Sequence, residues 1–143
     1  ALEVGADHVI DVMVDDPVDA VMDLTGGFGA SLAVDLASAP GTPSLCFDLV
    51  HHRATVIWAG MKDRQAVPVV TDKVVMKGLR VLGGAGGDAG SVDEAARILN
   101  EGGFPTAPLL GAVVGLDEID RAMALLHREG GEDAVRAVLK HTH

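Results

Sequence analysis

The stretch Thr55-Val56-Ile57-Trp58-Ala59-Gly60 decides the predicted fold, because it is almost wholly apolar and is stopped by a glycine. A short apolar run of this kind is typical of a strand that is covered on both faces of a sheet. Such strands alternate with helices in parallel α/β sheets. The stretch therefore predicts one strand of an α/β domain, whose neighbours must lie on either side of it in the sequence.

Four further strands are predicted, with helices between them. The strands cover residues 9–12, 18–24, 79–82 and 135–139. The helices cover residues 31–39, 44–51 and 71–77, followed by one that starts at the capping box Ser91-Val92-Asp93-Glu94 and ends at Gly102-Gly103, and by one that is capped by Asp117 and ends at Gly130-Gly131. This order predicts an α/β fold: an incomplete Rossmann-like, mostly parallel sheet with flanking helices.

The first residues of the chain are typical of the end of a helix. Residues Ala1-Leu2-Glu3-Val4 are typical of a last helical turn, and Gly5 of the turn that ends it. We therefore expect a segment before Ala1 that completes a larger α/β domain. On this interpretation residues 1–143 are a partial nucleotide-binding domain, and a complete activity is not expected of this piece alone.

Composition and charge exclude several classes of function. The 143 residues carry a formal net charge of −10, which argues against nucleic acid and anionic membrane surfaces as partners. No apolar run approaches the roughly 20 residues of a membrane-spanning helix, and no signal peptide is visible. The single cysteine, Cys46, rules out an internal disulfide, so a cytoplasmic location is the default expectation.

Small residues follow three of the predicted strands, at the edge where open parallel sheets bind ligands. The three stretches are Thr25-Gly26-Gly27, Ala59-Gly60-Met61 and Gly83-Gly84-Ala85-Gly86-Gly87. Small residues allow the backbone to approach a ligand closely and expose N–H groups as donors. A binding edge and a set of plain turns are both compatible with this pattern, because one glycine after a strand is most often just a turn.

A dinucleotide fingerprint is another interpretation of the last of these stretches. Gly84-Ala85-Gly86-Gly87-Asp88-Ala89 fits the pattern G-x-G-x-x-A, follows a predicted strand and precedes a predicted helix. Two features weigh against a phosphate loop. The Ser91 cap comes two residues late, and Asp88 would place a negative charge near the pyrophosphate. A different nucleotide binder that uses residues 84–89 as its phosphate loop stays open as an alternative.

The remaining residues predict neither a metal site nor a catalytic residue. His51 and His52 are adjacent, so they point in different directions in a helix and to opposite faces in a strand. Cys46 has no partner at metal-ligand spacing, and no Ser-His-Asp arrangement follows from the spacing. Arg136 lies between apolar residues of the last predicted strand, so it must reach an edge, an ion-pair partner or an anionic ligand.

Five stretches, taken together and in this order, resemble the coenzyme domain of the medium-chain dehydrogenase/reductase family, the zinc-type alcohol dehydrogenases and their zinc-free quinone-reductase relatives. They are Gly5-Ala6-Asp7-His8-Val9-Ile10-Asp11, Val18-Asp19-Ala20-Val21-Met22-Asp23-Leu24-Thr25-Gly26-Gly27, Ala54-Thr55-Val56-Ile57-Trp58-Ala59-Gly60, Lys77-Gly78-Leu79-Arg80-Val81-Leu82-Gly83-Gly84 and residues 116–140. The resemblance implies a hydride transfer between an alcohol or carbonyl compound and NAD or NADP. It also implies a dimer, because the strand that corresponds to residues 79–84 commonly helps to form one.

The resemblance assigns roles to individual residues. Thr25 and Gly26 would lie beside the adenosine half of the cofactor, and Arg136 matches a basic residue that contacts the pyrophosphate. The residues near the nicotinamide would be Ala59, Gly60, Met61, Gly84 and Gly86. The family's glycine fingerprint, its ribose-binding acid and the catalytic domain with its zinc ligands would all precede Ala1. Zinc is therefore possible in the parent enzyme, with no ligand for it in this chain.

Two departures from the family pattern concern the predicted elements. The family places a helix between the strands that correspond to residues 9–12 and 18–24, whereas only residues 13–17 separate them here. Five residues reach about 17 Å when extended, whereas the crossover must pass about three strand spacings, roughly 14 Å, and also return the length of a strand. The first strand therefore lies elsewhere or outside the sheet. The second departure is extra length around residues 39–47.

The leading hypothesis is a C-terminal coenzyme-domain fragment of an NAD(P)-dependent alcohol dehydrogenase that is inactive by itself and forms homo-oligomers. Its parent enzyme would bind the nicotinamide cofactor and a small alcohol or carbonyl substrate, but neither nucleic acid nor a membrane. The alternative from another class is a stand-alone, non-catalytic α/β module for nucleotide binding or oligomerisation.

Overall fold

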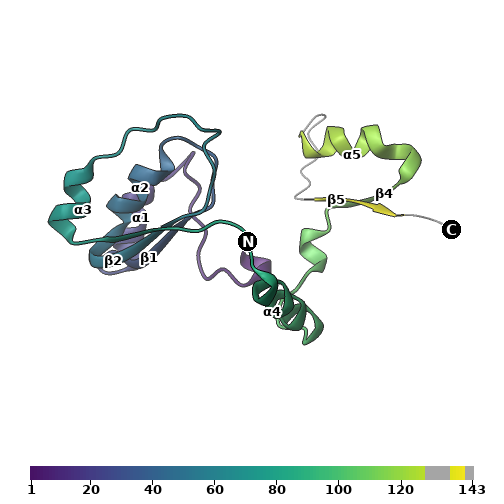
Figure 1. The fold of residues 1–143 in the computed structure, drawn as a ribbon, viewed down its shortest axis with the longest axis horizontal. Helices are drawn as coiled ribbons and strands as arrows, with labels where there is room; N and C mark the ends of the chain where they lie inside the picture. The colour runs from purple at the N-terminus through teal and green to yellow at the C-terminus, as the bar shows by residue number, and fades with distance from the viewer. Residues whose placement is uncertain (128–135, 141–143) are drawn as a thin grey trace. The chain divides into compact units, whose positions relative to one another are not determined.

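The computed structural model describes residues 1–127 and 136–140 (Figure 1). The described helices are α1 (Pro17–Leu24), α2 (Thr42–Leu49), α3 (Thr71–Lys77), α4 (Ala89–Asn100) and α5 (Ile119–Leu126), with short 3-10 helices at Leu2–Val4, Ala107–Leu109 and Leu116–Glu118. The strands are β1 (Ala30–Asp35), β2 (Val50–Trp58), β3 (Arg80–Gly83), β4 (Ala112–Gly115) and β5 (Ala137–Lys140). None of the helices in this part of the chain has the length and apolar character that a membrane span needs.

The chain divides into two compact units, one of residues 10–87 and one of residues 1–9 and 88–143. We call them the three-stranded unit and the two-stranded unit, because their sheets are β1-β2-β3 and β4-β5. All the described strand pairs are parallel. The predicted α/β class, with parallel strands and flanking helices, is therefore confirmed, although the described strands are divided between two sheets.

β2 is the central strand of the three-stranded unit, with β1 on one side and β3 on the other. The strand predicted at residues 55–59 is thereby confirmed as the second half of β2. α2 connects β1 to β2 and α3 connects β2 to β3, as parallel pairing requires. The predicted helices at residues 44–51 and 71–77 and the predicted strand at residues 79–82 are confirmed as α2, α3 and β3, with bounds shifted by no more than about two residues.

The core of the three-stranded unit lies between the sheet and α2. Phe47 of α2 is fully buried and packs against Trp58 of β2, with ring centroids 5.6 Å apart. Ala33, Val56 and Val81 lie in one row across the three strands and belong to the same apolar cluster. The apolar residues of β2 are therefore explained by burial under a helix.

Within the part of the chain that the structure describes, the opposite face of this sheet is only partly covered. Val34, Ile57 and Leu82 form the neighbouring row across the strands, and successive residues of a strand point to opposite faces. Val34 is 47% exposed and Leu82 is 44% exposed. α1 packs beside α2, and Figure 1 shows both helices on one side of β1 and β2. The face that carries Val34 and Leu82 therefore lies on the other side from α1 and α2.

The prediction of a strand at residues 18–24 is wrong, because this segment is helix α1. Asp16 caps the helix: its carboxylate accepts hydrogen bonds from the backbone N–H groups of Val18 (2.8 Å) and Asp19 (3.1 Å). Pro17 occupies the first helical position, where its fixed φ and missing N–H cost nothing. This start signal, Asp followed by Pro, outweighs the β-branched residues that favoured a strand.

The prediction of a helix at residues 31–39 is also wrong, because Ala30–Asp35 is strand β1, paired in parallel with β2. The two errors share one cause. The segment that is helix α1 was predicted as a strand, and the segment that is strand β1 was then predicted as the helix that follows it. With α1 as the helix, the five-residue crossover between two strands no longer exists. The extra length at residues 39–47 is the loop into α2 together with most of α2 itself.

The prediction of a strand at residues 9–12 is wrong as well. Residues 12–14 form a turn, in which the Asp11 carboxylate accepts a hydrogen bond from the backbone N–H of Met13 at 2.9 Å. The backbone carbonyl of Asp11 accepts another from Val14 at 2.9 Å. Backbone groups that bond within a turn are not available to a sheet ladder, which explains why this short apolar run is not a strand.

The two-stranded unit contains a parallel pair, β4 and β5, that sequence reasoning found only in part. β5 confirms the strand predicted at residues 135–139 from Ala137 onward, whereas Val135 lies outside the described residues. β4 was not predicted. α5 packs on both strands, with Ala122 and Leu125 buried.

Both helix caps predicted in this unit are wrong. α4 begins at Ala89 rather than at Ser91, because the Asp88 carboxylate accepts hydrogen bonds from the N–H and the hydroxyl of Ser91, each at 2.8 Å. Asp117 lies inside a 3-10 turn, and the Glu118 carboxylate instead accepts from the backbone N–H of Gly115 at 3.0 Å. The predicted helix end at Gly130-Gly131 lies outside the described residues.

Candidate functional site

The carboxyl ends of β1, β2 and β3 meet at one edge of the three-stranded sheet, because the strands are parallel. The backbone carbonyl of Asp35 accepts hydrogen bonds from the N–H groups of Ala59 (2.9 Å) and Gly60 (2.8 Å), and that of Trp58 accepts from Gly84 (2.9 Å). We call the loops at this end the carboxyl edge: residues 36–41, 59–65 and 84–87. Open α/β sheets bind ligands at such an edge.

Gly60 is the point where the loops after β1 and β2 come closest. A Cβ atom added to Gly60 would lie 2.1 Å from the carbonyl oxygen of Ala37 and 2.8 Å from the carbonyl carbons of Ala37 and Leu36. These are backbone atoms, so they cannot rotate away as the end of a side chain could. Contact between two loops therefore requires glycine at this position, where the sequence had left a ligand-binding edge and a plain turn both open.

A buried ion pair joins the same two loops. Asp35 is 3% exposed, and its Oδ2 accepts a hydrogen bond from Lys62 Nζ at 2.9 Å. Its Oδ1 accepts from the Thr42 hydroxyl (2.9 Å) and from the backbone N–H of Ala37 (3.0 Å). Lys62 Nζ also donates to the carbonyl oxygens of Ala37 and Gly60. The three donors of the ammonium group therefore have three acceptors.

The pKa of the Asp35 carboxyl reflects two opposing effects. Burial alone would raise this pKa, because a charged carboxylate loses hydration. The hydrogen bonds from Lys62, Thr42 and Ala37, together with the positive charge of Lys62, stabilise the charged form. Their combined effect is the larger one, and the pKa lies below its ordinary value of 3.8. Asp35 is therefore ionised at neutral pH, and its two oxygens accept hydrogen bonds from Lys62, Thr42 and Ala37.

Acid is expected to destabilise the three-stranded unit through Asp35. Because the folded pKa is lower than the unfolded value, the stabilisation is fully present above about pH 5 and is lost as the pH falls through about 4 and then through the folded pKa. Urea unfolding followed by Trp58 fluorescence tests this, because Trp58 is the single tryptophan. Between about pH 5 and pH 3 the native chain is expected to lose more stability than the Asp35→Asn variant. Equal losses would contradict this role of Asp35.

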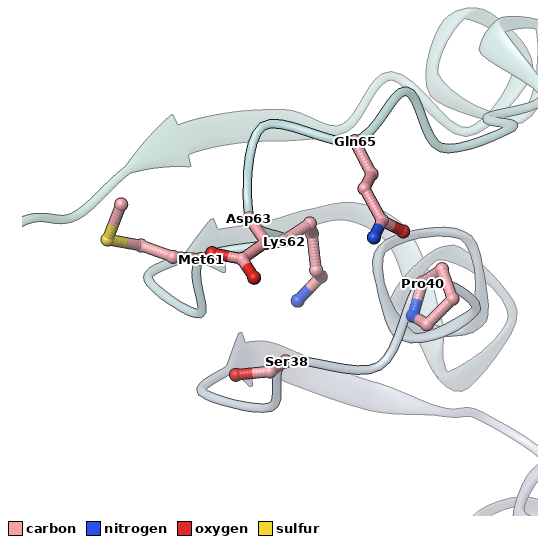
Figure 2. Close-up of a pocket in the computed structure, with 6 residues that line it drawn as sticks. All are labelled: Ser38, Pro40, Met61, Lys62, Asp63 and Gln65. Atoms are coloured by element: carbon pink, nitrogen blue, oxygen red, sulfur yellow. The ribbon is translucent and has the colours of Figure 1, made fainter.

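A cavity of about 430 Å³ opens at the carboxyl edge, between the loops after β1 and β2 (Figure 2). Its lining residues are Ser38, Pro40, Met61, Lys62, Asp63 and Gln65. Figure 2 shows the Lys62 ammonium and the Gln65 amide directed into the space between the two loops. The size suits part of a small ligand, and the hydroxyl, amide and carboxylate groups can bind ligand hydroxyls.

The structure brings part of the predicted cofactor site together. Ala59, Gly60, Met61 and Gly84 all lie at the carboxyl edge. The N–H groups of Ala59, Gly60 and Gly84 make the backbone hydrogen bonds given above, and Met61 lines the cavity. Gly86 follows Gly84 in the loop after β3 and has a φ of +61°, a conformation that favours glycine. The positive φ of the backbone is therefore sufficient to explain why residue 86 is a glycine.

Thr25 and Gly26 are not brought to this edge. They follow α1 and lead into the amino end of β1, where the Thr25 hydroxyl donates to the carbonyl of Val21 (2.7 Å) and accepts from the N–H of Gly29 (2.8 Å). Because β1 runs from Ala30 to Asp35, these two residues lie at the opposite edge from Gly60. The loop that follows β1 is instead Leu36-Ala37-Ser38.

Arg136 lies in the two-stranded unit, directly before β5. Its side chain is exposed, and its backbone carbonyl accepts a hydrogen bond from Ala112 at 3.2 Å. The predicted contact with the cofactor pyrophosphate stays a prediction.

Sequence reasoning missed the residues that organise the edge. Asp35 and Ser38 were placed inside a predicted helix, so they were not considered as groups at the end of a strand. Lys62 was not singled out because a surface lysine is the ordinary expectation. A signal was present, since Gly60-Met61-Lys62 follows the clearest strand of the chain and Asp35 ends another apolar run.

The loop that fits the G-x-G-x-x-A pattern has a structural role. The Asp88 carboxylate binds the first turn of α4 through the N–H of Ser91, where a phosphate would bind in a dinucleotide site. The hydrogen bonds to Ser91 lower the pKa of Asp88, so the carboxylate is charged at neutral pH. This arrangement disfavours a pyrophosphate at the start of α4.

The described residues do not fit a zinc site. In residues 1–127 and 136–140, no three His, Cys, Asp or Glu side chains converge as metal ligands would. Cys46 is a free, buried cysteine, and burial, followed by the negative charge of Asp35, raises the pKa of its thiol. A neutral, buried thiol is neither a metal ligand nor a nucleophile.

Comparison of the sequence with models of known protein families assigns the chain to one family. The family model described as zinc-binding dehydrogenase matches residues 1–101. The chain therefore belongs to the zinc-binding dehydrogenase family, and the resemblance to the zinc-type medium-chain dehydrogenases is confirmed.

Individual relatives agree with this assignment. The protein described as "Probable alcohol dehydrogenase adh" from Mycobacterium tuberculosis is 36% identical over 132 residues, which cover 90% of this chain and 36% of that protein. The alcohol dehydrogenase from Aeropyrum pernix has a TM-score of 0.77 at 28% identity, covering 96% of this chain and 38% of that one. Benzyl alcohol dehydrogenase from Acinetobacter calcoaceticus shares the fold, with a TM-score of 0.82 at 21% identity and the same coverage of 96% and 38%. The chain thus spans little more than a third of the length of these relatives.

Proposed function

We propose that this chain forms the carboxyl edge of an NAD(P)-binding site in an alcohol dehydrogenase, which transfers hydride between an alcohol or carbonyl substrate and the nicotinamide cofactor. The observation that carries the proposal is the cavity beside Gly60 and Met61, at the ligand-binding edge of a parallel sheet, in a member of the zinc-binding dehydrogenase family. The curated relative from Mycobacterium tuberculosis, described as an alcohol dehydrogenase, supports the reaction class.

The chain's own residues would bind and orient the cofactor, which supplies the hydride acceptor or donor when bound. Ser38, Asp63 and Gln65 present polar groups to hydroxyls in the cavity, and Leu36-Ala37-Ser38 replaces Thr25-Gly26 as the loop we assign to the cofactor. Arg136 is proposed as a pyrophosphate contact. We assign neither the proton relay nor a zinc ligand to the described residues. A homo-oligomer, a cytoplasmic location and a single partial NAD(P)-binding domain over residues 1–143 stay predictions.

The isolated chain is expected to bind NADH and NADPH weakly, with a dissociation constant above about 10 μM, near −7 kcal/mol. The physical reason is that Lys62, the cation that lines the cavity, already has its three donors engaged, so the cofactor phosphates gain no ammonium partner there. Titration calorimetry with each dinucleotide measures this affinity. Binding much tighter than 10 μM would show a more complete site than the one proposed.

The location of the site is tested by filling the cavity. The Ser38→Trp variant places a bulky side chain in the lining and is expected to weaken NADH binding at least about tenfold, a loss of roughly 1.4 kcal/mol. Val75→Trp is the matched control, because Val75 lies on α3 and is 79% exposed. The proposal fails if Ser38→Trp binds NADH as the control does.

A further inference from the structure

We propose that Lys62, through its pair with Asp35, is a positioning residue that holds the loops after β1 and β2 in the geometry needed for cofactor binding; this inference rests on the function proposed above. It assigns to Lys62 a role other than direct contact with the cofactor. Three observations support the proposal. They are the acceptors of the Lys62 hydrogen bonds, the absence of a free N–H donor on its ammonium group, and the close contact between the two loops at Gly60.

The hydrogen bonds of Lys62 connect two segments that are distant in the sequence. Lys62 belongs to the loop after β2, whereas its acceptors include the Asp35 carboxylate at the end of β1, 27 residues away, and the carbonyl of Ala37 in the next loop. The third acceptor, the Gly60 carbonyl at 3.3 Å, lies in its own loop. One side chain therefore ties the end of β1, the loop after it and the loop after β2.

The ammonium group has no spare donor for a phosphate. An –NH₃⁺ group has three N–H donors, and each has an acceptor here. The Lys62 side chain is 11% exposed and the Asp35 side chain is 1% exposed. Lys73 offers a contrast within the same unit, since its side chain is 34% exposed and pairs with Asp48, whose side chain is 36% exposed. Burial and saturation together favour a positioning role for Lys62.

Contacts of Ala59 and Gly60 with the loop after β1 make the geometry of both loops depend on the Lys62–Asp35 pair. The N–H groups of Ala59 and Gly60 donate to the backbone carbonyl of Asp35, and Gly60 faces the Ala37 carbonyl with no room for a side chain. Without Lys62, the Asp35 carboxylate would be buried and uncompensated, so the loops would separate to hydrate it. The amides of Ala59 and Gly60 would then open to solvent, and the cavity lining would lose its fixed spacing.

Hydrogen exchange and cofactor titration of the Lys62→Met variant test the inference in the full chain. The amides of Ala59 and Gly60 are expected to exchange at least about tenfold faster than in the native chain, because their opening becomes easier. Amides of the core helix α2 are expected to change much less. The affinity for NADH, titrated at millimolar concentration by NMR, is expected to fall about tenfold because the free chain spends less time in the binding geometry.

Lys73→Met is the matched control, since it removes a lysine from another Asp–Lys pair of the same unit, and it is expected to change neither measurement. If Lys62→Met does not fold, the double variant Asp35→Asn/Lys62→Met is used, because it leaves no uncompensated buried charge. Faster exchange and weaker NADH binding are expected of that variant too. A purely structural lysine would lower the melting temperature without a selective change at Ala59 and Gly60.

Each outcome decides the question. Unchanged exchange at Ala59 and Gly60 would overturn the positioning role, whatever the titration shows. Faster exchange with unchanged NADH affinity would also overturn it, because the loops would then be tied for stability alone. If the native chain binds neither NADH nor NADPH at millimolar concentration, the proposed function fails, whereas the exchange data still decide whether Lys62 fixes the two loops.

Discussion

Replacement of Gly60 by alanine is expected to lower the free energy of unfolding of the three-stranded unit by about 3 kcal/mol, at the upper end of the usual cost of overpacking. The added Cβ would lie 2.1 Å from the carbonyl oxygen of Ala37, far inside van der Waals contact. Relief requires the loops after β1 and β2 to separate, which strains the hydrogen bonds from Ala59 and Gly60 to Asp35. Urea unfolding followed by Trp58 fluorescence measures the change.

Gly83→Ala is the matched control for this substitution. Gly83 ends β3 at the same side of the sheet, but a Cβ there would meet nothing within 4 Å. Alanine also costs less conformational entropy on folding than glycine, so this variant is expected to be neutral or slightly stabilised. A Gly60→Ala chain that unfolds at the same urea concentration as Gly83→Ala would show that the two loops are not in the close contact described here.

The Asp35→Asn variant is expected to lose about 3 kcal/mol of stability, because breaking a buried ion pair leaves one charge without its partner. Asparagine keeps the shape of the side chain, and its carbonyl oxygen can still accept from Thr42 and Ala37. The loss therefore reports on the charge of Lys62 rather than on packing. The same fluorescence-detected urea unfolding at pH 7 measures it.

Asp48→Asn provides the comparison, since Asp48 pairs with Lys73 at 2.6 Å but both side chains are about one-third exposed. Exposed pairs contribute at most about 1 kcal/mol, so this variant is expected to remain close to the native chain. Equal losses in the two variants would indicate that burial does not distinguish the pairs, and would remove the basis for assigning a special role to Asp35.

Elements with a strong local signal were predictable from the sequence. β2 could be recognised because its second half is an unbroken apolar run that ends at Gly60. α3 was predicted with its observed bounds, because it ends at Gly78, which has a φ of +61°, the conformation that typically ends a helix. In both cases the chemistry of a few neighbouring residues was sufficient.

α1 and β1 could not be assigned from periodicity, because short apolar segments satisfy both helical and strand patterns. The start of α1 was nevertheless encoded in Asp16-Pro17, and greater weight on that signal would have placed both elements correctly. Once β1 was taken as a helix, Asp35 could not be recognised as the last residue of a strand. The resemblance placed a cofactor loop at Thr25-Gly26, which lies before the amino end of β1 and therefore at the opposite edge from Gly60.

The candidate site was predictable only where its residues end or directly follow a recognisable strand, as Ala59, Gly60, Met61 and Gly84 do. Gly60 and Gly84 follow strands and could be found by position. The pair of Asp35 and Lys62 depends on the parallel register of β1 and β2, which brings together residues that are 27 positions apart. A tertiary contact of this kind has no local sequence pattern, so it emerged only from the structure.

The partly covered face of the three-stranded sheet determines how the stability of this unit depends on temperature. Val34 and Leu82 stay nearly half hydrated in the folded state, so unfolding adds less apolar surface to water than it would for a sheet covered on both faces. The heat capacity of unfolding is therefore expected to fall below the usual value of about 12–15 cal/mol/K per residue. Because this quantity sets the curvature of the stability curve, the unit has a flat curve that changes little on cooling.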